Sequence, residues 1–363
     1  MELGHSAGRS LYTAPENGIA ESQHRGHWHV CRRVEALRFL ARKFPRDLQA
    51  AVVITIHLAS NFRSEFDKIL SRDGPLPATF ARDGEPMEKG RIYLAPPEHH
   101  LILDDNDRLC LGIGPRENGS RPAIDPMFRS AAACCGARAI GVVLTGTLGD
   151  GASGLWVMRQ CGGITVVQDP SDAAYRVMPE TALILVQPDH VASLMEMPAL
   201  LTKLAQEPAG KTKPVPESLR YEIEVAKSGR TNMKEMDRVG RRSVLSCPDC
   251  GGVMWEIDEE GLVRYRCHVG HAYTADVMNV ALDESLRRAL ASGLRALEER
   301  VALAQKMSKR ASIGGRTRVA QEWAEHARTL DHETALIRDL VTRIEEQGAG
   351  PEEQLLKQTG TGP

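Results

Sequence analysis

The chain has 363 residues, of which 42% are hydrophobic and 26% are charged, and its formal net charge is −2. This length is enough for two or three domains of ordinary globular composition. The balance of 46 basic and 48 acidic residues argues against a general nucleic-acid-binding surface, and no apolar run is long enough to span a membrane. The N-terminus lacks the pattern of a signal peptide, so we expect a cytoplasmic protein whose eight cysteines are thiols or metal ligands.

The first half of the chain alternates between helical and strand-like patterns. Residues 1–26 show no convincing periodicity, so we expect a disordered or mistranslated N-terminus. Within 27–205 the apolar spacing predicts helices over 34–44, 61–70, 124–134 and 154–160, and strands over 51–56, 91–95, 100–103, 108–111, 139–144 and 164–168. This alternation predicts an α/β domain with a doubly wound, mostly parallel sheet.

The second half divides into smaller parts. Residues 206–240 carry several Pro, Lys and Glu residues and are interpreted as a linker, and residues 241–275 hold a compact Cys/His cluster. Apolar residues recur every three or four positions on both sides of Gly314 and Gly315, which predicts an α-helical hairpin over 276–347. The tail, 348–363, is expected to be disordered.

Two polar side chains follow predicted buried strands. His57 comes directly after Ile54-Thr55-Ile56, and Asp150 lies in the glycine-rich turn after the strand at 139–144. Each has a purely structural alternative, since His57 could be capped by local backbone and Asp150 could be a helix N-cap. Because parallel strands present their carboxyl ends at one edge of the sheet, we expect the two side chains to meet there. A buried Asp can fix the tautomer of a His and stabilise its protonated form.

Six stretches occur in one order along the chain: VEALRFLARKFP, AVVITIHL, GRIYLAPPEHHLIL, GPRENGSRPAIDPMFRSAA, GVVLTGTLGDGASGL and GGITVVQDPSDAAYRVMP. Through these stretches the chain resembles the catalytic domain of the chemotaxis protein-glutamate methylesterase (CheB) family, without the receiver domain that many members carry. The resemblance implies hydrolysis of glutamate methyl esters on chemoreceptors, and also glutamine deamidation, by a Ser–His–Asp mechanism. His57 then resembles the general base and Asp150 the orienting acid.

The nucleophile departs from the family pattern. Members carry a G-x-S-x-G-G turn directly before the helix that begins VEAL, whereas this chain has HWHVCRR there, with Val30 in the place of the serine. Codons for HWHVCRR, read one base later, can encode Ile-Gly-Thr-Ser-Ala-Gly-Gly, so we consider a double frameshift as well as true loss. Ser6, in GHSAG, and Cys31 are weaker candidate nucleophiles. If no nucleophile is present, the alternative is a catalytically dead interaction or scaffold protein.

The Cys/His cluster has the spacing of a zinc site. Cys247 and Cys250 form a CxxC pair, and Cys267 and His271 follow as CxxxH, which supplies the four ligands of a closed structural zinc site. His268 could replace His271, and a coincidental group of thiols is the other alternative. The residues between the pairs predict a β-hairpin and thus a zinc ribbon. No cofactor for catalysis is expected.

The partner expected from the resemblance is a methylated chemoreceptor or a similar helical protein. The C-terminal helices are also candidates for forming a homo-oligomer. Nucleic-acid binding through Arg241, Arg242, Arg264 and Arg266 is a weaker alternative, and membrane insertion is not expected.

Overall fold

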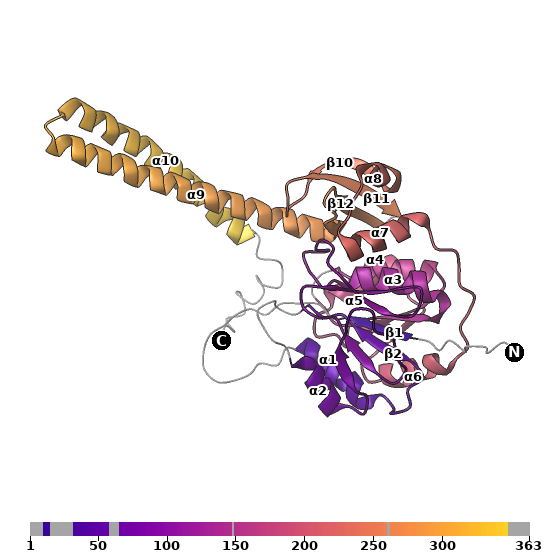
Figure 1. Cartoon of the computed structure of the whole chain (residues 1–363). Coiled ribbons are helices and arrows are strands. Elements are labelled where there is room, and N and C mark those ends of the chain that lie inside the picture. The colour runs from indigo at the N-terminus through magenta and orange to yellow at the C-terminus, as the bar shows by residue number, and fades with distance from the viewer. Residues whose placement is uncertain (1–9, 15–31, 58–64, 147–148, 260–261, 348–363) are drawn as a thin grey trace. The chain divides into compact units, whose positions relative to one another are not determined.

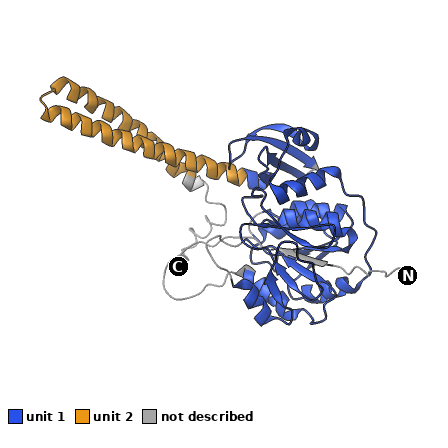
Figure 2. Ribbon diagram, in the orientation of Figure 1, with its two compact units in different colours: residues 1–278 blue, residues 279–363 orange. Residues whose placement is uncertain are grey.

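The computed structural model describes residues 10–14, 32–57, 65–146, 149–259 and 262–347. The chain divides into two compact units, residues 1–278 and residues 279–363, which Figure 2 shows in different colours.

The first unit is built on a parallel seven-stranded sheet. Its strands are short, and Ala51–Ile54 and Ala139–Val143 are buried along their whole length because both faces of the sheet are covered. In spatial order they are β3 (Ala78–Phe80), β4 (Ile92–Leu94), β2 (Ala51–Ile54), β1 (Ser10–Ala14), β7 (Ala139–Val143), β8 (Ile164–Gln168) and β9 (His190–Ala192).

The central strand β1 corrects one expectation. Residues 1–26 were expected to be disordered, yet Ser10–Ala14 pairs in parallel with both β2 and β7, so that Leu11 lies opposite Val52 and Ile140. A segment with a weak local pattern forms a strand here because neighbours on both sides satisfy its backbone hydrogen bonds. The rest of this stretch lies outside the described residues.

Helices cover both faces of the sheet (Figure 1). On one face lie α1 (Arg32–Lys43), α2 (Phe66–Asp73) and α6 (Met197–Gln206), whose apolar side chains form one core cluster with the strands. On the other lie α3 (Ile124–Cys135), α4 (Ala152–Gln160) and α5 (Val177–Val186), which form a second cluster. A short 3₁₀ helix, Gly136–Arg138, leads from α3 into β7. The predicted α/β fold with a parallel sheet is thus confirmed.

A separate antiparallel hairpin follows β4. It consists of β5 (His100–Leu103) and β6 (Leu109–Gly112), joined by a turn at Asp104–Asp107. The Asp104 carboxylate accepts a hydrogen bond from the backbone N–H of Asn106 at 2.9 Å, which is typical of such turns.

The stretch expected to be a linker contains two helices, α7 (Glu217–Ser228) and α8 (Met233–Val239). The prediction of a linker over 206–240 is therefore wrong for these residues. The Cys/His region follows as an antiparallel sheet of β10 (Arg241–Ser246), β11 (Val253–Glu259), β12 (Leu262–Cys267) and β13 (Ala272–Thr274). We call this four-stranded sheet, with the loops between its strands, the ribbon.

Two long helices end the described chain, α9 (Ala275–Ile313) and α10 (Thr317–Gln347), as predicted. They pack through an apolar cluster that includes Val301, Ala304, Ala327 and Leu330, and Glu298 pairs with Arg338 at 2.7 Å. In the described part of the chain, no helix combines the length and apolar character needed to cross a membrane.

Candidate active site and metal-ligating cluster

His57 and Asp150 meet at the carboxyl edge of the sheet. His57 follows β2 and Asp150 follows β7, the two strands that flank β1. After β1, the chain adds strands first on the β2 side and then on the β7 side, so β1 lies at the switch point of the sheet. The ring Nε2 of His57 lies 3.1 Å from the Asp150 carboxylate, and only 4% of His57 and none of Asp150 is exposed. Two residues 93 positions apart thus form a buried imidazole–carboxylate pair.

Asp150 is held by several further donors. Its Oδ2 accepts the backbone N–H of Ile124 at 2.7 Å, and its Oδ1 accepts those of Asp125 at 3.2 Å and Gly151 at 3.1 Å. Two of these amides belong to the first turn of α3, where free N–H groups favour a negative charge. Burial opposes ionisation of Asp150, but the hydrogen bond from His57 and these amides outweigh it and hold the pKa of Asp150 below its usual value.

A second buried carboxylate, Asp125, lies beside the first. Its Oδ1 accepts the backbone N–H groups of Gly151 and Gly154 at 3.0 and 2.7 Å. Burial and the charge of Asp150 raise the pKa of Asp125 to about 7. Asn118 bridges the two carboxylates, since its Nδ2 donates to Asp125 and to Asp150, each at 3.0 Å.

The other ring nitrogen of His57 faces a hydroxyl. Ser120 Oγ lies 3.2 Å from His57 Nδ1. Because Nε2 faces the ionised Asp150, we assign the ring proton to Nε2, so that Nδ1 accepts a hydrogen bond from the Ser120 hydroxyl. A general base needs an unprotonated ring nitrogen, and in this assignment Nδ1 is that nitrogen. The candidate nucleophile positions, Ser6, Val30 and Cys31, lie outside the described residues.

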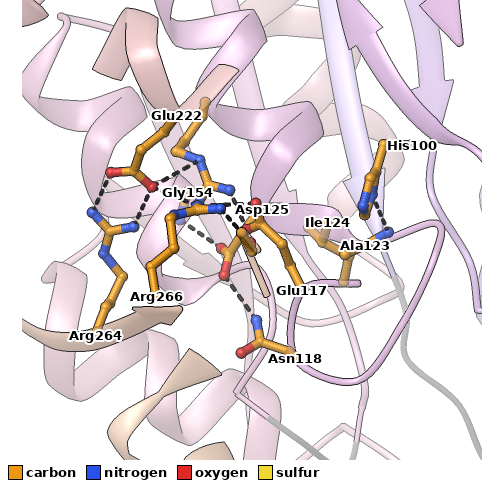
Figure 3. Close-up of polar contacts among 12 residues, drawn as sticks. His100, Glu117, Asn118, Ala123, Ile124, Asp125, Gly154, Glu222, Arg264 and Arg266 are labelled. Carbon is orange, nitrogen blue, oxygen red and sulfur yellow. Dashed lines mark hydrogen bonds and ion pairs between the residues drawn. The ribbon is translucent and has the colours of Figure 1, made fainter. Parts of the chain in front are cut away.

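His100 lies near the same turn but has a structural role. It is fully buried, its Nε2 donates to the carbonyl of Pro115 at 2.9 Å, and its Nδ1 accepts from the N–H of Ala123 at 3.2 Å. Burial lowers the pKa of His100, which keeps the ring neutral. Figure 3 shows His100 beside Ala123 and Ile124, at the entry to α3.

A buried network of charges joins the α/β domain to the ribbon, and we call it the ion network (Figure 3). Glu222 on α7 binds Arg264 with both oxygens at 2.7 and 2.9 Å and Arg266 at 2.8 Å. Glu117, in the turn before α3, binds Arg266 at 3.0 Å and also pairs with Arg129 of α3. All five side chains are at most 4% exposed.

The four predicted metal ligands converge. Their ligand atoms, three Sγ atoms and one His Nδ1, lie within 4.8 Å of one another. Sγ of Cys250 is 3.7 Å from Sγ of Cys267, and Nδ1 of His271 is 3.6 Å from Sγ of Cys247 and 3.5 Å from Sγ of Cys267. A tetrahedral zinc ion with normal bond lengths requires S–S separations of about 3.8 Å and S–N separations of about 3.6 Å. The residues present therefore fit a four-coordinate metal.

His268 is not part of this cluster. It is exposed, and its ring packs against Gly252, where an added Cβ would lie 1.9 Å from the ring.

A second group of possible metal ligands has no signal in the sequence, because Cys134 and Cys135 lack ligand spacing. Their sulfurs lie 3.1 Å apart on α3, with Asp107 close by.

The fold and this site define an α/β protein with a buried His–Asp pair at the switch point of a parallel sheet. Residues 33–201 match the family described as CheB methylesterase, and the chain belongs to this family. A relative from Leptospira interrogans is 33% identical over 173 residues, which cover 48% of this chain and 90% of the relative.

Two further proteins are similar to part of the chain. A Myxococcus xanthus protein named protein-glutamate methylesterase/protein-glutamine glutaminase 3 is 37% identical over 166 residues, 46% of either chain. The crystal structure of the Thermotoga maritima CheB methylesterase catalytic domain aligns with a TM-score of 0.49 and 23% identity, over 55% of this chain and 99% of that chain.

Proposed function

We propose that the chain is a protein-glutamate methylesterase-type hydrolase, which removes methyl esters from glutamates of chemoreceptors or similar helical proteins and also deamidates glutamine. The buried His57–Asp150 pair, 3.1 Å apart in a chain of the CheB family, carries this proposal. The names of the curated relatives support the reaction class. The cytoplasmic location stays a prediction.

The geometry supports acyl transfer with His57 as the base. His57 Nε2 keeps its proton and donates a hydrogen bond to Asp150, so that Nδ1 can take the proton of an attacking hydroxyl. The hydroxyl oxygen bonds to the ester carbon, the bond to the methoxy oxygen breaks, and methanol leaves with the proton from His57. Water, activated by the same nitrogen, then hydrolyses the acyl-enzyme to the free carboxylate.

The attacking hydroxyl decides the rate. Val30 has no hydroxyl, and loss of a triad nucleophile lowers turnover by roughly a million-fold. We therefore expect the chain to be a slow esterase, and expect full activity from a serine-restored variant, in which residues 27–33 are replaced by Ile-Gly-Thr-Ser-Ala-Gly-Gly.

Methanol release from a methylated receptor tests this proposal. The assay compares the chain, the serine-restored variant, and that variant with His57→Gln added. His99→Gln is the matched control, since the ring of His99 lies against local backbone, with Nδ1 3.1 Å from the Pro97 carbonyl. We expect release from the restored variant, retention with His99→Gln, and loss with His57→Gln. A folded restored variant that releases no methanol would refute the esterase proposal.

A non-catalytic interaction protein is the second candidate. Val30 at the nucleophile position favours it, and so do the exposed apolar side chains on the two long helices. These include Leu286, Leu303, Ile313, Leu336 and Leu340, which are between 39% and 80% exposed. The predicted homo-oligomer through these helices belongs to this candidate, and sedimentation of the purified chain tests it.

We also propose that Cys247, Cys250, Cys267 and His271 hold a structural zinc ion. The separations of their ligand atoms match a tetrahedron, and four protein ligands leave no position for substrate. Zinc would fix the ribbon by joining its first loop to the β12–β13 loop. Elemental analysis of the purified chain tests this, since one tightly bound zinc per chain is expected.

A further inference from the structure

The turn between β6 and α3 touches both the ribbon and Asp150. Asn118 lies in this turn with a φ of 50°, followed by Gly119 with a φ of 75°, and it is 4% exposed. Asn tolerates this left-handed conformation better than most residues. The position thus combines an unusual backbone conformation with an almost completely buried polar side chain.

Asn118 uses its polar atoms on two sides. Toward the active site, its Nδ2 donates to Asp150 Oδ1 and Asp125 Oδ2, each at 3.0 Å. Toward the ribbon, its Oδ1 accepts the N–H of Thr274 at 3.0 Å, and its own N–H donates to the carbonyl of Ala272 at 2.7 Å. One side chain therefore connects the orienting carboxylate to a strand 156 residues away.

The ribbon residues that reach this turn lie next to the metal ligands. Ala272 follows His271, and Arg266, which binds Glu117 at 3.0 Å, precedes Cys267. The N–H of Cys267 also donates to the carbonyl of His271 at 2.9 Å. A metal that fixes Cys267 and His271 therefore fixes both segments of the ribbon that hold the turn.

We propose that Asn118 is a positioning residue through which the metal-loaded ribbon holds Asp150, and with it His57, in the aligned arrangement. This inference rests on the proposed function for its catalytic meaning. Without the Asn118 amide, two buried carboxylates lose a shared donor, and an unsatisfied buried charge is costly. Without the metal, β12 and β13 loosen, and Asn118 loses its anchors at Ala272 and Thr274.

Hydrogen exchange followed by mass spectrometry tests this coupling in the full chain, with Zn²⁺ bound and after removal by a chelator. In the wild-type chain, we expect zinc removal to accelerate exchange in the ribbon and also in residues 115–126 and 149–152. In Asn118→Gly, which permits the same backbone conformation, we expect 115–126 to exchange about ten- to a hundredfold faster even with Zn²⁺ bound. Asn106→Gly, in an exposed turn, is the matched control and should change neither segment.

A ring nitrogen signal provides a second measurement. The ¹⁵N spectrum of His57 should show one dominant tautomer, protonated on Nε2, in the zinc-loaded chain, and should move toward a tautomer mixture in Asn118→Gly and after zinc removal. Acceleration confined to the ribbon, with residues 115–126 and the His57 signal unchanged, would overturn the inference. Absence of methanol release from every variant would count against the proposed function and leaves this result unaffected.

Discussion

Removal of the charge on Glu222 should destabilise the first unit far more than an ordinary surface substitution. Glu222 is 1% exposed and binds Arg264 and Arg266 through three contacts of 2.7 to 2.9 Å, with Arg129 Nε at 3.7 Å. The ion network contains three arginines and two glutamates, so Glu222→Gln raises its buried net charge from +1 to +2.

The expected loss is about 3 kcal/mol of unfolding free energy, near the lower end for breaking a buried ion pair, because glutamine keeps the shape and one acceptor oxygen. This is a large part of the stability of a typical domain. Burial alone would raise the pKa of Glu222, but the charges of Arg264 and Arg266 hold it well below 4.5. The stabilisation by the ionised form is therefore fully present above the unfolded pKa and is lost only in strong acid, so the loss should be constant between about pH 6 and 8.

Urea unfolding followed by tryptophan fluorescence is a suitable assay, because Trp255, one of the four tryptophans of the chain, is fully buried in the ribbon. Glu65→Gln is the matched control, since Glu65 pairs with Lys68 at 2.6 Å on the surface and should cause no measurable change. Equal midpoints and slopes for Glu222→Gln and Glu65→Gln would show that the ion network does not stabilise the ribbon against the α/β domain.

Three further outcomes are expected. Asp150→Asn in the serine-restored variant should lower the turnover number for methanol release about ten-thousand-fold, because the wrong tautomer of the histidine is then favoured; a loss below tenfold would contradict the role of the orienting acid. The pKa of Asp125 is raised to about 7 in the folded state, so the folded state loses stability as the pH rises from about 4 to about 7. The unfolding free energy of the wild type, measured relative to Asp125→Asn, should therefore fall by about 3 kcal/mol between pH 5 and 8. A pH-independent difference between the unfolding free energies of the wild type and Asp125→Asn would contradict the raised pKa of Asp125. Cys250→Ser should lower the zinc content and the unfolding midpoint of the ribbon, whereas Cys161→Ser, away from the metal-ligating cluster, should keep zinc; equal zinc content in both would argue against the site.

Local sequence patterns are sufficient to predict most helices and strands of the α/β domain. Buried strands such as 139–143 and helices such as 124–135 have apolar periodicities that predict one structure, and the CxxC and CxxxH spacings predict the four metal ligands. Helix α7 was missed because its buried face contains Glu222 beside Leu219 and Val225, and a charged residue on an apolar face breaks the pattern of an amphipathic helix.

The amino-acid sequence alone determined the fold class, the family, and the placement of His57 and Asp150 at the ends of two strands. These features depend only on local periodicity and on motifs a few residues long. Only the tertiary structure decided that Ser10–Ala14 is the central strand and that Asn118 joins Asp150 to the ribbon. Those contacts join residues far apart in the chain, and a polar residue that becomes buried by a distant partner has the same local pattern as one that remains in solvent.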